Sequence, residues 1–188
     1  MLEKLRKSIS PLIEKAGRVA ASTGLPPSFW TGLGLVLSVI SALAYARFLP
    51  GGPPFAGILL LAAGGLDIID GAVAKATSRE SKSGAFIDST ADRISEVVIF
   101  SGIIFGGYTF PLVVLLALSL SLLTSYARAR AEPLGVDLRG VGIAERPERL
   151  IILSSFSFFS LVGYAVMLIV ILEGATFVQR VIVTLKKI

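Results

Sequence analysis

Long uncharged stretches alternate with short polar segments along this chain, and the alternation predicts most of its elements. Apolar residues run from Ser28 to Phe48, roughly 20 positions, which is enough to cross the ~30 Å hydrocarbon layer of a bilayer as one helix. The apolar runs lack the strict alternation of apolar and polar residues that is typical of half-buried strands. The sequence therefore predicts transmembrane helices.

Turn residues between the apolar runs mark where further helices begin and end. The proline- and glycine-rich turn 49–54 closes the first run, and Gly106-Gly107 separates the third from the fourth. The second helix is expected from Phe55 past Asp70, the third from Gly84 to Phe105, and the fourth from Phe110 to Ala131.

The last part of the chain, from Arg146 to Ile188, contains no polar loop. As one helix at ~1.5 Å per residue it would be about twice as long as the hydrocarbon layer is thick. A turn is therefore expected near Ser160–Gly163, which gives a fifth and a sixth helix. The fold class is all-α integral membrane: one domain over 1–188, with a six-helix transmembrane bundle over 28–188.

Residues 1–18 form a different kind of helix, in which one narrow apolar stripe runs along a charged surface. The stripe consists of Leu2, Leu5, Ile9, Leu12, Ile13 and Ala16. This pattern is typical of an amphipathic helix that lies on an anionic membrane surface. We therefore expect an N-terminal interfacial helix before the first span.

Composition supports a membrane protein and limits its chemistry. The chain is 54% hydrophobic and only 16% charged, which is too apolar for an ordinary soluble protein. It has no Cys and no His, so a metal ion would have to be bound by oxygen. Of its 18 Lys and Arg residues, only Arg47 falls near the face opposite the termini. The positive-inside rule therefore places the other face in the cytoplasm, and we expect a multi-pass protein of the cell membrane without a nucleic-acid partner.

Carboxylates and small residues share one face on each of two expected helices. The stripe of the second helix is Asp67, Asp70, Gly71 and Ala74, and that of the third is Gly84, Asp88 and Asp92. Four facing carboxylates near a hydrocarbon boundary would repel strongly unless cations neutralised them. Oxygen ligands favour Mg²⁺ or Mn²⁺, and four aspartates can hold two such ions in a clamp suited to displacement at phosphorus.

Each part of this pattern also has a simpler interpretation. Small residues in membrane helices often serve close helix packing, and an intramembrane carboxylate can line an ion pathway. A divalent-cation transporter is therefore the alternative from another functional class. A transporter should place polar groups on both sides of the midplane, whereas the aspartates here gather near one face.

The full spacing, Asp67-x2-Asp70-Gly71-x2-Ala74-Lys75-x8-Gly84-x3-Asp88-x3-Asp92, resembles the signature of the CDP-alcohol phosphatidyltransferases. In this family an Arg usually stands where this chain has Lys75, which keeps the charge but loses bidentate geometry. The resemblance implies that Asp67, Asp70, Asp88 and Asp92 bind two divalent cations, and that Asp92 is also the catalytic general base. It further implies a homodimer.

The resemblance also implies a binding site for a CDP-linked lipid. Its residues would be Ser28, Thr31, Gly71, Ala74, Lys75, Ser81 and Gly84. Gly71 would let the diphosphate approach the backbone. Ser28 and Thr31 open the first expected helix, so either could instead cap that helix.

Arginines gather at the ends of the later helices, in segments 125–132 and 145–150. These segments resemble the branch of the family that makes phosphatidylinositol phosphate, including its archaeal relatives. The resemblance implies that Arg128, Arg149 and Arg180 bind 1D-myo-inositol 3-phosphate, which accepts the lipid group as CMP is released. Arg130 and Arg139 are expected to follow only the positive-inside rule. The alternative acceptors are glycerol 3-phosphate, serine or another small alcohol.

Overall fold

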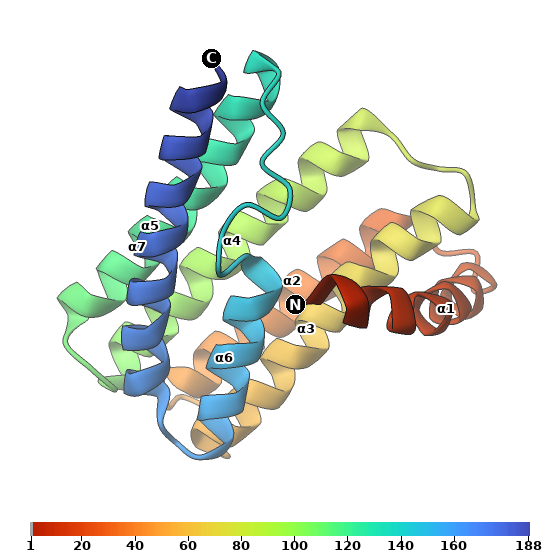
Figure 1. Cartoon of the computed structure of the whole chain (residues 1–188). Coiled ribbons are helices and arrows are strands. Elements are labelled where there is room, and N and C mark those ends of the chain that lie inside the picture. Colours follow the sequence, from red (N-terminus) through yellow and green to blue (C-terminus); the bar gives the residue numbers. More distant parts are fainter. Residues whose placement is uncertain (1) are drawn as a thin grey trace.

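A computed structural model of the chain describes residues 2–188, with side chains from Ser10 onward. Within that range every regular element is a helix and none is a strand, so the all-α prediction is confirmed. The elements are α1 (Leu2–Ala21), α2 (Pro27–Tyr45), α3 (Gly52–Ala76), α4 (Lys82–Gly106), α5 (Pro111–Ala131), the 3-10 turn η1 (Glu132–Leu134), α6 (Arg146–Phe158) and α7 (Val162–Lys187) (Figure 1).

The helix boundaries follow the local chemistry of the turns. Proline is the first residue of α2 and of α5, where its missing N–H has no helical partner to lose. Gly51, the N-cap of α3, and Gly107, the C-cap of α4, have φ values of 95° and 68°. Residues with a side chain rarely adopt such values, so glycine suits both positions. The expected turn before the last helix falls at residues 159–161, between α6 and α7.

Helix α2 is the scaffold of the first half, because both α3 and α4 pack against it. A Cβ built on Gly102 of α4 would lie 2.3 Å from the carbonyl oxygen of Ala42, so only glycine permits this approach. Towards its N-terminus α4 leaves the bundle, and Phe86 is 71% exposed. Helices α3 and α4 therefore diverge towards the loop that joins them (Figure 1).

The second half consists of α5 packed against α7, and of α6 packed against α3 and α7. The main apolar core lies among all six helices from α2 to α7. Its buried members are Ala42, Ala44, Tyr45, Ala56, Leu60, Ile99, Phe100, Ile103, Val114, Ala117, Leu153, Val162, Ala165, Val166 and Ile169. This core joins the two halves away from the α3–α4 loop.

Four helices, α2, α3, α5 and α7, are long and apolar enough to cross a membrane. Helix α4 is long, but it carries Asp92, Arg93 and Glu96 near its middle. Helix α6 has 13 residues and is only about 20 Å long at 1.5 Å per residue. Length and composition alone therefore support a multi-pass protein with four candidate spans, fewer than the six expected.

Helix α1 extends three residues beyond the expected range, to Ala21, and packs against α3. The contact is close, because a Cβ on Gly17 would lie 2.6 Å from the Cβ of Ala72. Leu12, from the predicted apolar stripe, is 67% exposed. The stripe residues Leu2, Leu5 and Ile9 lie outside the described side chains.

Candidate active site

Three of the four predicted aspartates meet where α3 and α4 diverge. Asp67 and Asp70 of α3 and Asp88 of α4 each offer a carboxylate oxygen, and these oxygens lie within 4.8 Å of one another. Asp70 is buried, and the Thr31 hydroxyl of α2 donates to its Oδ2 at 2.6 Å. Thr31 therefore belongs to the aspartate cluster rather than to a helix cap.

The donor set fits a hard divalent cation. All three groups are carboxylates, the ligands that Mg²⁺ and Mn²⁺ prefer. Asp88 Oδ1 is buried, and none of the described groups donates a hydrogen bond to it. A buried carboxylate oxygen that accepts no hydrogen bond is costly unless a cation lies next to it. The cluster can therefore bind metal, although these residues alone do not determine the number of ions.

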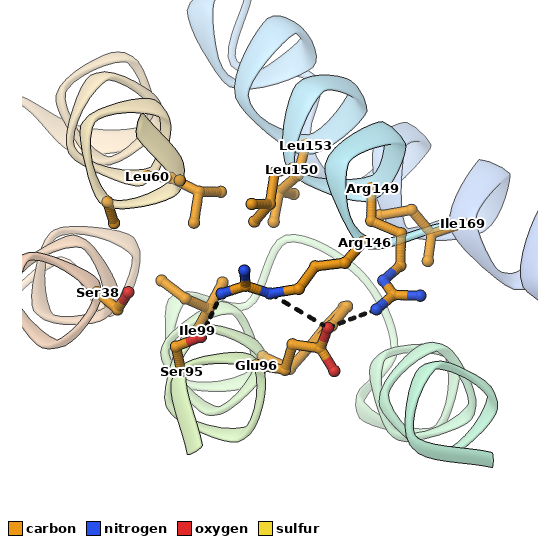
Figure 2. A pocket seen from close by; sticks show the side chains of 13 residues that line it. Ser38, Leu60, Ser95, Glu96, Ile99, Arg146, Arg149, Leu150, Leu153 and Ile169 are labelled. Carbon is orange, nitrogen blue, oxygen red and sulfur yellow. Dashed lines mark hydrogen bonds and ion pairs between the residues drawn. The ribbon is translucent and has the colours of Figure 1, made fainter. Parts of the chain in front are cut away.

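The fourth aspartate, Asp92, stands outside this group and is held by arginines. Arg146 of α6 places its two terminal nitrogens 2.8 Å from Asp67 and 2.8 Å from Asp92. Arg93 approaches Asp92 from the same helix at 3.4 Å. Figure 2 shows the Arg146 side chain reaching from α6 across to Ser95 and Glu96 of α4. One guanidinium group thus links the aspartates of two helices.

A second buried ion network lies deeper, next to Arg146. Arg149 is 5% exposed and forms ion pairs with Glu96 of α4 and with Glu173 of α7. The sequence patterns did not predict that Arg146, Glu96 and Glu173 belong to the site. Glu96 could have been found, because it extends the i, i+4 stripe of Asp88 and Asp92 by one more turn.

Arg180 connects the helix segments that carry the other two arginines assigned to the acceptor, Arg128 and Arg149. Arg180 is 3% exposed and donates to the carbonyl of Thr124, to the carbonyl of Val141 and to Glu145. Thr124 precedes Arg128 by one helical turn, and Glu145 precedes Arg149 by one turn. Arg128 is partly exposed and pairs with Glu132 at 3.0 Å. All three arginines are therefore already engaged with carboxylates.

The loop between η1 and α6 closes over this region. Its Ile143 and Ala144 amides both donate to the Thr176 hydroxyl of α7, and its own Leu138 is fully buried. On its exposed side, hydrogen bonds from Arg139 lower the pKa of Asp137 to about 2. Arg139 thus belongs to a surface pair.

The remaining residues assigned to the CDP-lipid lie on α2 and α3 and at the start of α4. A Cβ on Gly71 would meet nothing within 4 Å, so the space beside it is open. Lys75 and Ser28 are exposed, and Ala74 is half-buried. Ser81 is the N-cap of α4 and accepts a hydrogen bond from the Gly84 amide at 3.0 Å. Ser81 and Gly84 therefore have a local structural role.

A multi-pass helical bundle with an all-oxygen cation cluster at one end defines a membrane protein with the features of a metal-dependent enzyme. The sequence model of the CDP-alcohol phosphatidyltransferases matches residues 25–185, and the chain belongs to this family. It is therefore a transferase, and the predicted family is confirmed. The transporter alternative has no support.

Relatives and solved structures agree over nearly the whole chain. An archaetidylinositol phosphate synthase of Pyrococcus horikoshii is 41% identical over 181 residues, covering 96% of this chain and 95% of the relative. The crystal structure of Mycobacterium tuberculosis phosphatidylinositol phosphate synthase with manganese and citrate matches with a TM-score of 0.80 at 28% identity, covering 92% of this chain and 88% of that one. The same enzyme with CDP-DAG bound gives a TM-score of 0.78 at 28% identity, covering 93% and 94%.

Replacing Arg149 with Met should destabilise the protein by about 3–5 kcal/mol, because Glu96 and Glu173 would be left buried without their cation. Thermal or chemical unfolding in detergent measures this. The control is Arg139→Met, whose side chain is 75% exposed. Adding Glu173→Gln to Arg149→Met should recover part of the loss, because one bare charge is removed. Wild-type stability of the Arg149 variant would contradict the network.

Proposed function

We propose that the enzyme transfers the phosphatidyl or archaetidyl group of a CDP-linked glycerolipid to 1D-myo-inositol 3-phosphate and releases CMP. The observation that carries the proposal is the position of α6, whose N-terminal end places Arg146 at the aspartates and Glu145 at Arg180. A cation cluster and an arginine-rich region thus adjoin. The Pyrococcus and Mycobacterium relatives, named for inositol phosphate lipids, support the same acceptor.

On the donor side, the four aspartates bind two divalent cations, Mg²⁺ or Mn²⁺, which neutralise the diphosphate when bound. The cytidine diphosphate lies against Gly71, where the open space beside the backbone can take a bulky group. Thr31 holds the buried Asp70 in place. Lys75 supplies a positive charge to the phosphates, with Ser28, Ala74, Ser81 and Gly84 lining the same side.

Asp92 is the general base. Its carboxylate takes the proton of the inositol hydroxyl, and the hydroxyl oxygen forms a bond to the lipid-side phosphorus. The bond between that phosphorus and the bridging oxygen breaks, and CMP leaves with the electron pair. Arg93 and Arg146 hold Asp92 from two sides and so orient its oxygens. The reaction needs no covalent enzyme intermediate.

On the acceptor side, Arg128, Arg149 and Arg180 recognise the inositol phosphate. Guanidinium groups match phosphate oxygens in geometry and charge. Glu132 and Glu145 now occupy Arg128 and Arg180, so an incoming phosphate replaces carboxylate oxygens on these two donors. The runner-up is the same chemistry with glycerol 3-phosphate, serine or another alcohol.

In the membrane, all six helices from α2 to α7 cross or enter the bilayer. Helix α4 buries Glu96 and turns Ile94 and Val97 outward, at 46% and 41% exposure, which suits a span with a polar inner face. Helix α1 lies at the interface with Leu12 turned away from α3. The distribution of basic residues places the aspartates at the cytoplasmic side. The family resemblance favours a homodimer.

Asp70→Asn and Asp88→Asn should each abolish nearly all CMP release while leaving a folded protein, because a lost carboxylate weakens the cation clamp and also relieves repulsion without metal. Turnover at saturating Mg²⁺ and thermal unfolding measure the two effects. Asp137→Asn, on the exposed loop, is the matched control. Near-normal turnover in either cluster variant would refute the two-cation site.

Arg180→Ala should raise the acceptor KM by roughly ten- to a hundredfold, as expected from about 1.5–3 kcal/mol for a lost charge-assisted hydrogen bond. The KM for CDP-lipid should change little. Thr176→Val is the control, because it loosens the same loop at Ile143 and Ala144 without removing a phosphate donor. An equal rise in both variants would assign the effect to loop order instead.

The acceptor assignment is tested by CMP release from CDP-lipid with inositol 3-phosphate, free inositol and glycerol 3-phosphate side by side. Free inositol should be far poorer than its phosphate ester, because the buried arginines gain no phosphate partner. Equal use of both would disprove the arginine pocket. A preference for glycerol 3-phosphate would favour the runner-up acceptor.

A further inference from the structure

Arg146 contacts Asp67 of the cation cluster as well as Asp92, and orienting Asp92 for the transfer reaction does not require this second contact. Arg146 is the first residue of α6, directly after the N-cap Glu145. Glu145 and Glu148 form a capping box, and Glu145 also pairs with Arg180. The base of the Arg146 side chain is thus fixed, and its guanidinium group is directed into the aspartate site.

The carboxylates that Arg146 contacts are not equivalent. Asp67 is one of the three cluster aspartates, whereas Asp92 stands apart. Both lie 2.8 Å from a terminal nitrogen of Arg146. Of the described residues, Arg146 alone forms an ion pair with Asp67, through Oδ2. The cation that neutralises part of the cluster is therefore supplied by the protein itself.

A divalent ion that binds Asp67 must share this carboxylate with Arg146 or displace it. Two cations at neighbouring positions repel each other, and the low-dielectric surroundings strengthen the repulsion. Arg146 has another carboxylate within reach, because its Nε lies 4.0 Å from Glu96 Oε1. Glu96 already pairs with Arg149 through Oε1 and lies 3.8 Å from Arg93 through Oε2, but this buried Oε2 accepts no hydrogen bond from the described residues. Glu96 can therefore still accept a hydrogen bond from Arg146.

We infer that Arg146 is a tethered counter-ion of the aspartate site. Its guanidinium group bridges Asp67 of α3 and Asp92 of α4 and so holds the two helices together. When divalent cations bind, its guanidinium group leaves Asp67 and moves towards Glu96. Arg146 thereby lowers the affinity for metal and keeps the empty site folded. The inference relies on the proposed metal site but not on the acceptor.

The test measures Mn²⁺ affinity directly, by electron paramagnetic resonance of the free ion, with the full chain in detergent or nanodiscs. Arg146→Gln should bind Mn²⁺ about tenfold more tightly than wild type, because the competing charge is gone. Its unfolding temperature in EDTA should fall well below that of wild type, and Mn²⁺ should restore most of the difference. Both quantities, the Mn²⁺ affinity and the unfolding temperature, are measured without turnover.

Arg139→Gln is the matched control, since it removes the same charge from the exposed loop pair and should leave Mn²⁺ affinity unchanged. Arg146→Lys keeps the charge but cannot bridge two carboxylates as a fork, so it should bind Mn²⁺ more tightly than wild type by a smaller factor. Arg146→Lys is also the test variant to use if Arg146→Gln does not fold. Unchanged or weaker Mn²⁺ binding in the Arg146 variants would overturn the inference, because Arg146 would then support the ligands. Absent Mn²⁺ binding in wild type would instead refute the metal site itself.

Discussion

Carboxylates inside an apolar bundle need cations close by, and this requirement organises the site. Six acidic groups gather along α3, α4 and α7, namely Asp67, Asp70, Asp88, Asp92, Glu96 and Glu173. The guanidinium groups that contact them belong to Arg93, Arg146 and Arg149. Arg149 pairs with Glu96 and Glu173, so its positive charge does not neutralise the aspartates. The shortage of positive charge at Asp70 and Asp88 is what suits this end of the bundle to a divalent cation.

The packing of the helices leaves space for the aspartate cluster. Helix α4 is tied to α2 by the close approach of Gly102 to Ala42 and of Gly106 to Tyr45, at the end away from the aspartates. At the other end it separates from α3 towards the loop that joins the two helices. The short α6 fits beside α3 because Gly57 and Gly64 leave space for its Ser154 and Leu150. Its N-terminus then reaches the level of the aspartates, where it can present Arg146.

Local sequence patterns were enough for the helices and for the helix faces that carry the aspartates. Apolar runs and the turns between them predicted the helices from α2 to α5 and the reversal before α7, because these depend on hydrophobicity and on turn residues. The i, i+4 spacing of Asp88 and Asp92 placed both carboxylates on one face. The interfacial position of α1, the six spans, the homodimer and the roles of the individual site residues remain predictions.

Partners that lie far apart in the sequence were decided only by the tertiary structure. Arg149 follows Glu96 by more than fifty residues, and only the packing of the whole bundle buries it between Glu96 of α4 and Glu173 of α7. Arg146 was visible in the sequence as one more basic residue at a helix end, and nothing local showed that it reaches Asp67 and Asp92. The sequence by itself determined which segments are helical and which carboxylates share a face, because both follow from periodicity along one chain segment. Which cation neutralises which carboxylate depends on distances between helices, and those are set only when the whole bundle packs.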